Sequence, residues 1–155
     1  MKIFLLTHER ELHRATNTGS IAIEESNEIV ERIVWERTKP NKDLTQLIEN
    51  HKAILLYSKG ESSSELASTS IEDYENIIII DSTWQEAKKI FNHSAYLKNA
   101  PQFTLKTTRD SLYKLRANQP KGGLCTIECI IEVLRLKGQS EIASALSLKF
   151  EQFNG

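Results

Sequence analysis

Short runs of apolar residues recur along the chain and predict buried strands. Ile77–Ile80 is a run of four β-branched residues between polar neighbours, which is typical of a strand buried on both faces. Lys2–Thr7 and Ala53–Tyr57 have the same character. Glu28–Glu36 shows strand-like alternation, and Gln102–Thr107 can form a further strand.

Helical patterns separate these runs. Asp43–His51, Thr126–Lys137 and Ser140–Phe153 each place apolar residues on one face of a helix. A further helix is expected directly after the isoleucine run, capped by Ser82 or by Thr83. Strands that alternate with helices predict an α/β fold around a mainly parallel sheet. We expect residues 1–155 to form a single domain.

The remaining polar segments are interpreted as loops. They are His8–Gly19, the turn at Lys39–Asn41, the serine-rich Glu61–Ser70 and Asp110–Gly123.

Composition restricts the function classes only slightly. The 155 residues are 39% hydrophobic and 26% charged, with a net charge of −1, so a nucleic-acid partner requires a local basic patch. The sequence shows neither a membrane-spanning run nor a signal peptide, and we expect a cytoplasmic protein. Cys125 and Cys129 stand four residues apart in an expected helix, which favours two reduced packing thiols and no metal site.

Three polar clusters lie where an expected strand is followed by a helix. They are His8–Gly19, Asp81–Trp84 and Leu124–Glu128. The carboxyl ends of parallel strands meet at one edge of a sheet, where ligands bind, so these clusters are expected to form one pocket. Structural readings stay open for each. Asp-Ser-Thr before a helix is ordinary capping, a lone Trp is more often core, and Thr126 is more often a cap than a ligand contact. Glu128 also interacts favourably with a helix dipole.

Taken together, the clusters resemble the signatures of the DTW-domain proteins, a family of tRNA-uridine aminocarboxypropyltransferases. The first family motif is matched by His8, Glu11, Arg14, Thr16, Asn17, Thr18 and Gly19. The central Asp-Gly-Thr-Trp motif is matched by Asp81, Thr83, Trp84, Ala87 and Lys88, and the last motif by Thr126 and Glu128. Ser82 replaces the usual Gly, Glu9 the usual Pro, and Cys125 and Cys129 the usual Ser and Ala. The resemblance covers essentially the whole chain.

The resemblance implies a SPOUT-related α/β fold with a knotted C-terminal region. It also implies that S-adenosylmethionine, bound without metal, donates its 3-amino-3-carboxypropyl group to N3 of a tRNA uridine and leaves methylthioadenosine. Two alternatives stay open. One is a SPOUT-type methyltransferase that uses the same donor, and the other is a non-catalytic RNA-binding protein. We expect tRNA as the partner, no membrane association, and a monomer.

Residue roles follow from the same resemblance. Asp81 is the catalytic candidate. A carboxylate at the rim of the sheet, the edge formed by the carboxyl ends of its strands, could take the N3 proton or orient the imide. Trp84 offers an aromatic face to the adenine or to the sulfonium. The other candidates for binding the donor are Thr16, Asn17, Thr18, Leu56, Ser82, Thr83, Leu124, Thr126 and Glu128. The candidates for binding RNA phosphates are Arg14, Lys88, Lys89, Arg109, Lys114, Arg116 and Lys121.

Overall fold

A parallel sheet organises the molecule. The computed structural model describes residues 1–57, 71–103, 105 and 125–155, except for the side chain of Trp84. Its five strands are β1 (Lys2–Thr7), β2 (Val30–Val34), β3 (Ala53–Leu56), β4 (Asn76–Asp81) and β5 (Gln102–Phe103). They lie in the order β2-β1-β4-β3-β5, and every pair is parallel. The predicted α/β class with a mainly parallel sheet is therefore confirmed.

The helices connect and cover these strands. They are α1 (Gly19–Glu25), α2 (Lys42–Glu49), α3 (Trp84–Asn92), α4 (Ala95–Lys98), α5 (Thr126–Leu136) and α6 (Ser140–Asn154), with 3-10 helices at Glu9–His13 and Ile71–Asp73. The predicted helices after the isoleucine run and at the C-terminus are confirmed. The expectation of a loop throughout His8–Gly19 is wrong, because a 3-10 turn occupies part of it and α1 begins at its last residue. Such short helices leave no readable period in the sequence.

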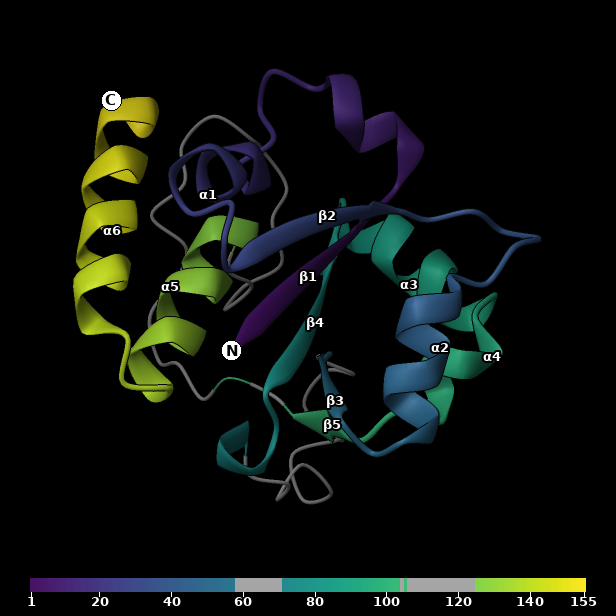
Figure 1. The fold of residues 1–155 in the computed structure, drawn as a ribbon. Helices are drawn as coiled ribbons and strands as arrows, with labels where there is room; N and C mark the ends of the chain where they lie inside the picture. The colour runs from purple at the N-terminus through teal and green to yellow at the C-terminus, as the bar shows by residue number, and fades with distance from the viewer. Residues whose placement is uncertain (58–70, 104, 106–124) are drawn as a thin grey trace.

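Strand alternation divides the core into two layers. On one face of the sheet, Leu5, Ile77 and Ile79 pack with α1, α5 and α6. On the other face, Leu6 and Ile78 pack with residues from α2, α3 and α4. Figure 1 shows the two groups of helices on opposite sides of the strands. Side chains at successive positions of a strand point to opposite faces, which explains why β4 feeds both layers.

The two central strands, β1 and β4, lead to helices on opposite faces. β1 pairs with β4 along its whole length and continues through α1 into β2 at one edge. β4 continues through α3 and α4 into β5 at the other edge. This change of direction between neighbouring strands is a topological switch point, and ligands bind outside the carboxyl ends of the strands at such points.

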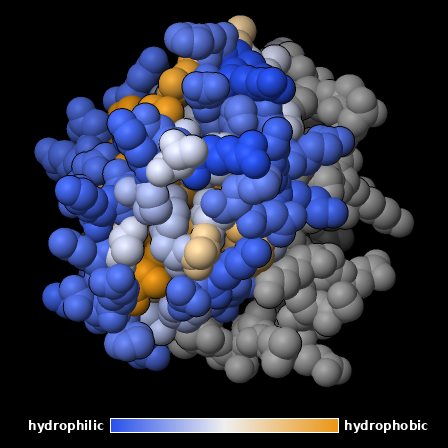
Figure 2. Space-filling view, turned by 90° about the vertical axis from the view of Figure 1, so that its right-hand side faces the viewer, coloured by the Kyte–Doolittle hydropathy of each residue, from blue (hydrophilic) through white to orange (hydrophobic). Residues whose placement is uncertain are grey.

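Part of the sequence interpretation lies outside the described residues. This applies to Glu61–Ser70, to Asp110–Gly123 and to most of Gln102–Thr107 beyond Phe103. Residues 106–124 link β5 to α5, so the predicted knot stays a prediction. Figure 2 shows that the surface on the side of α2 and α4 is mostly hydrophilic, with small hydrophobic areas. Among the described helices, none is both long and apolar enough to cross a membrane.

Candidate active site

The carboxylate of Asp81 is the centre of a buried polar network at the switch point. Only 1% of Asp81 is exposed. Its Oδ1 accepts hydrogen bonds from Asn17 Nδ2 at 3.0 Å and from Thr126 Oγ1 at 2.9 Å. Its Oδ2 accepts from Thr7 Oγ1 and Asn17 Nδ2, both at 3.1 Å, and from Arg32 Nη2 at 3.3 Å. One carboxylate thus joins the ends of β1 and β4 to the starts of α1 and α5.

Backbone geometry dictates the convergence of these side chains. Thr7 and Asp81 are register partners at the carboxyl ends of β1 and β4. Both continue the alternation that points Leu5 and Ile79 toward α1 and α5. Gly19 allows α1 to approach, since a Cβ added there would lie 2.8 Å from Asp81 Oδ2 and 3.1 Å from Leu5 Cδ1. The close contact between helix and carboxylate therefore requires glycine at this position.

Asn17 bridges the network with both ends of its amide. The Nδ2 group donates to Asp81 and to Glu11 Oε1, the latter at 3.1 Å. The Oδ1 atom accepts from Ser20 N, Ser20 Oγ and Arg32 Nη2, each at 2.9 Å. Asn17 is buried, so its amide binds within the protein. Direct contact of Asn17 with a donor molecule stays a prediction.

The start of α5 is held to the same centre. The Thr18 hydroxyl, which is buried, accepts from the backbone N of Ile127 at 3.1 Å. The interpretation of Thr126 as the helix cap is wrong, because Cys125 is the N-cap and the Thr126 hydroxyl donates to Asp81. Glu128 is buried and closes the capping box, with its Oε1 accepting from Cys125 N at 3.1 Å.

A second charged group, formed by Arg14, Glu11 and Glu86, stands beside Asp81. Arg14 binds Glu86 in a bidentate pair at 2.8 and 2.9 Å and also binds Glu11. Burial alone would raise the pKa of Glu86, but the bonds from Arg14 and Thr83 outweigh it and lower the pKa to about 2. Thr83 and Glu86 form the capping box of α3, so Thr83 is the cap among the two residues, Ser82 and Thr83, expected from the sequence.

Arg32 belongs to the network, and sequence reasoning missed it. It lies on β2, where the pattern showed only a polar position alternating with apolar ones. Its Nη2 atom binds Asn17 and Asp81, and the Asp81 contact is an ion pair at 3.3 Å. Within the described part of the chain, its buried Nε has no hydrogen-bond partner. An arginine in an otherwise half-apolar strand was the available signal.

The other predicted residues are distributed around this centre. Leu56 and Thr16 are half-buried, Ser82 donates from its hydroxyl to Thr83 O at 3.2 Å, and Lys88 and Lys89 are exposed on α3. Trp84 is the first residue of α3, and its side chain lies outside the described part. Leu124, Arg109, Lys114, Arg116 and Lys121 also lie outside the described residues.

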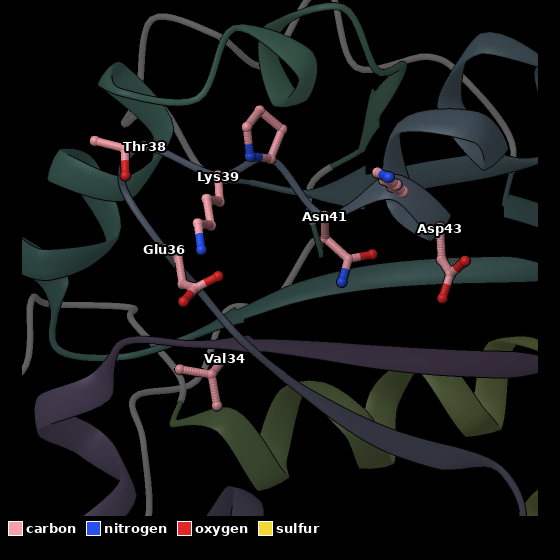
Figure 3. A pocket seen from close by; sticks show the side chains of 8 residues that line it. Val34, Glu36, Thr38, Lys39, Asn41 and Asp43 are labelled. Atoms are coloured by element: carbon pink, nitrogen blue, oxygen red, sulfur yellow. The ribbon is translucent and has the colours of Figure 1, made fainter.

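A surface pocket of about 570 Å³ is formed by residues other than those of the Asp81 network. It is lined by Val34, Glu36, Thr38, Lys39, Pro40, Asn41, Lys42 and Asp43. Figure 3 shows these residues between the end of β2 and the start of α2. Its described lining contains none of the predicted site residues. Among the described residues, no three or more His, Cys, Asp or Glu side chains lie together in a group that could hold a metal.

Comparison with known proteins assigns the family. The DTW domain model matches residues 1–155. The chain belongs to the DTW-domain family. This confirms the resemblance seen in the motifs at Asp81 and in the two flanking clusters.

A curated relative of this DTW-domain protein carries an enzyme's name. Over 96 residues the chain is 30% identical to tRNA-uridine aminocarboxypropyltransferase 2 of Macaca fascicularis. The match covers 61% of this chain and 32% of the relative, so it spans about a third of the relative's length. No solved structure matches this DTW-domain protein.

Proposed function

We propose that this DTW-domain protein transfers the 3-amino-3-carboxypropyl group of S-adenosylmethionine to N3 of a tRNA uridine. Family membership and the name of the curated relative support the reaction class. The observation that carries the proposal is the network around Asp81. It ties all three family motifs to one switch point, where ligands of open α/β sheets bind.

The site has features that suit such a donor. The Nε of Arg32 is buried and has no hydrogen-bond partner among the described residues, so a bound ligand could provide its acceptor. Asp81, Glu11 and Glu86 bring negative charge that favours a sulfonium. When bound, the donor supplies an electrophilic carbon: the bond from uridine N3 to this carbon forms, the carbon–sulfur bond breaks with its electron pair left on the sulfur of methylthioadenosine, and the N3 proton passes to solvent.

Asp81 is the organising residue of the proposed site. Its carboxylate is buried and accepts five hydrogen bonds, so it fixes the motif segments relative to one another. Taking a proton from uridine would require these bonds to rearrange. The orienting role is therefore preferred to that of the proton acceptor. A rim held in this way reduces the reorganisation needed to align the two reactants.

Contact with RNA is proposed for α3. The Arg14 guanidinium is paired with the carboxylates of Glu11 and Glu86. Lys88 and Lys89, in contrast, are exposed on α3, the helix that begins at the rim. Replacing Lys88 by Glu should weaken tRNA binding and flatten its salt dependence by about one phosphate contact. The matched control is Lys52→Glu. Lys52 is exposed at the amino-terminal end of β3, away from the rim, so this change should leave tRNA affinity and its salt dependence unchanged.

A SPOUT-related arrangement with a C-terminal knot remains part of the proposal, because the family resemblance implies it. The whole proposal is tested by mass spectrometry of nucleosides from tRNA incubated with protein and S-adenosylmethionine. We expect uridine that carries one aminocarboxypropyl group, together with free methylthioadenosine. Methyluridine with adenosylhomocysteine would identify a methyltransferase instead. Unmodified tRNA that nevertheless binds would identify an RNA-binding protein.

A further inference from the structure

We propose that Arg32 binds the carboxylate of the aminocarboxypropyl group and thereby selects a donor that carries it. This inference rests on the proposed function and names a specificity residue for it. Arg32 reaches the rim from β2, a strand that contributes none of the three motif segments. Its guanidinium is the candidate contact for an anionic group on the small reactant.

The bonding of the guanidinium is one-sided. Within the described residues, all of its hydrogen bonds use Nη2, which lies 2.9 Å from Asn17 Oδ1, 3.3 Å from Asp81 Oδ2 and 3.4 Å from Ser20 Oγ. The Nε atom is buried without a partner there. An unsatisfied buried donor is costly, so its presence points to an acceptor brought by a ligand. The Arg32 side chain keeps 20% of its surface exposed, so a ligand can reach it from solvent.

The neighbouring groups are poorly suited to hold a carboxylate. The Nη1 and Nη2 groups of Arg14 are engaged by the carboxylates of Glu86 and Glu11. The Asn17 amide is bonded within the network at both ends, and the Thr18 hydroxyl accepts from the start of α5. Among the described residues, Arg32 is thus the arginine at this site that has a buried donor without a partner. Its planar fork matches a carboxylate, whereas the surrounding acidic groups would repel one.

The same arrangement predicts selectivity. A donor without the carboxylate has a larger net positive charge, and the acidic groups alone would bind it more tightly. Preference for the carboxylate-bearing form therefore requires a specific cation. Methylthioadenosine, the proposed product, also lacks this carboxylate, so loss of the Arg32 contact would help it leave.

The test is calorimetric binding of S-adenosylmethionine and of its decarboxylated analogue to the same protein sample. The wild-type protein should prefer S-adenosylmethionine by about tenfold to a hundredfold, the range of a charge-assisted hydrogen bond. Arg32→Gln should reduce this preference to about threefold or less. Arg37→Gln, at an exposed position after the same strand, is the matched control and should keep the full preference. The ratio of the two affinities is independent of the folded fraction.

The outcomes separate this inference from the proposed function. If the wild-type protein binds neither compound, the proposed function fails and the inference with it. If it binds both equally, or if Arg32→Gln retains the full preference, only the inference is overturned. Should Arg32→Gln not fold, Arg32→Lys replaces it. Because lysine lacks the fork, its preference should fall below that of wild type, and an unchanged preference would overturn the proposal.

Discussion

The two faces of the sheet end differently at the same carboxyl edge. On the face of α2, α3 and α4, a neutral hydrogen bond borders the apolar layer. Trp35 Nε1 donates this bond of 2.8 Å to Ser94 Oγ, and both residues are buried. On the face of α1 and α5, the layer ends in the charged network of Asp81 and Arg32. One edge therefore carries an ordinary core closure on one side and a costly ionic cluster on the other.

This difference shows on which side of the sheet buried polar groups lower the stability of the fold. A hydrogen bond such as Trp35–Ser94 satisfies the indole at little cost. A buried carboxylate with a guanidinium carries a desolvation penalty that replacement by apolar residues would often remove. The network also leaves Arg32 Nε unpartnered among the described residues. Expensive, incompletely satisfied polar groups at a switch point are expected of a ligand site.

The largest expected effect comes from removing the centre of the polar side. Asp81→Ala removes the acceptor shared by Thr7, Asn17, Thr126 and Arg32 and leaves the Arg32 charge without its carboxylate, so it should lower the free energy of unfolding by about 3–5 kcal/mol. Ser94→Ala, the counterpart on the apolar side, should lower it by about 1–2 kcal/mol. Urea unfolding of both variants measures the contrast, and equal losses would contradict it.

Gly19 tests how tightly the polar side is assembled. In Gly19→Ala the new methyl would meet the Asp81 carboxylate and Leu5, so α1 or the carboxylate must shift. The expected loss is about 1–3 kcal/mol, as for other overpacked sites, despite the better helix propensity of alanine. A thermal unfolding midpoint at or above that of wild type would show that α1 does not approach the carboxylate this closely.

A smaller, pH-dependent effect is expected for Glu86, which links α3 to Arg14. Its pKa of about 2 in the folded protein lies below the ordinary value of 4.5, so its stabilisation is present above about pH 4.5 and is lost as the pH falls toward 2. The stability difference between wild type and Glu86→Gln should therefore shrink by on the order of 2 kcal/mol over that interval. A difference that stays constant with pH would mean that the ion pair with Arg14 does not form.

Sequence patterns predicted the sheet better than the site. Four consecutive isoleucines between polar residues are typical of a buried strand, as β4 is, and the polar clusters after β1 and β4 meet because these parallel strands are neighbours. Of the two caps expected for α3, Thr83 is the one observed, whereas the cap of α5 is Cys125 and not Thr126, because neighbouring residues before a helix can all cap it.

Contacts between residues far apart in the sequence could not be predicted in this way. Arg32 occupies an alternating position in a strand, and nothing in β2 indicates that its guanidinium reaches the acid at the end of β4. That contact depends on which strands are neighbours and on their register. Likewise, the burial of Asn17 and Thr18 follows from the approach of α1 to the sheet, a helix too short to be read from periodicity.

Isotopic labelling distinguishes transfer of the aminocarboxypropyl group from transfer of the methyl group. Protein and tRNA are incubated with S-adenosylmethionine labelled either in its carboxyl group or in its methyl group, and the label in tRNA is counted. We expect carboxyl label to enter tRNA in proportion to modified uridine, while methyl label remains in methylthioadenosine. Methyl label in tRNA at stoichiometric yield, without carboxyl label, would contradict this expectation.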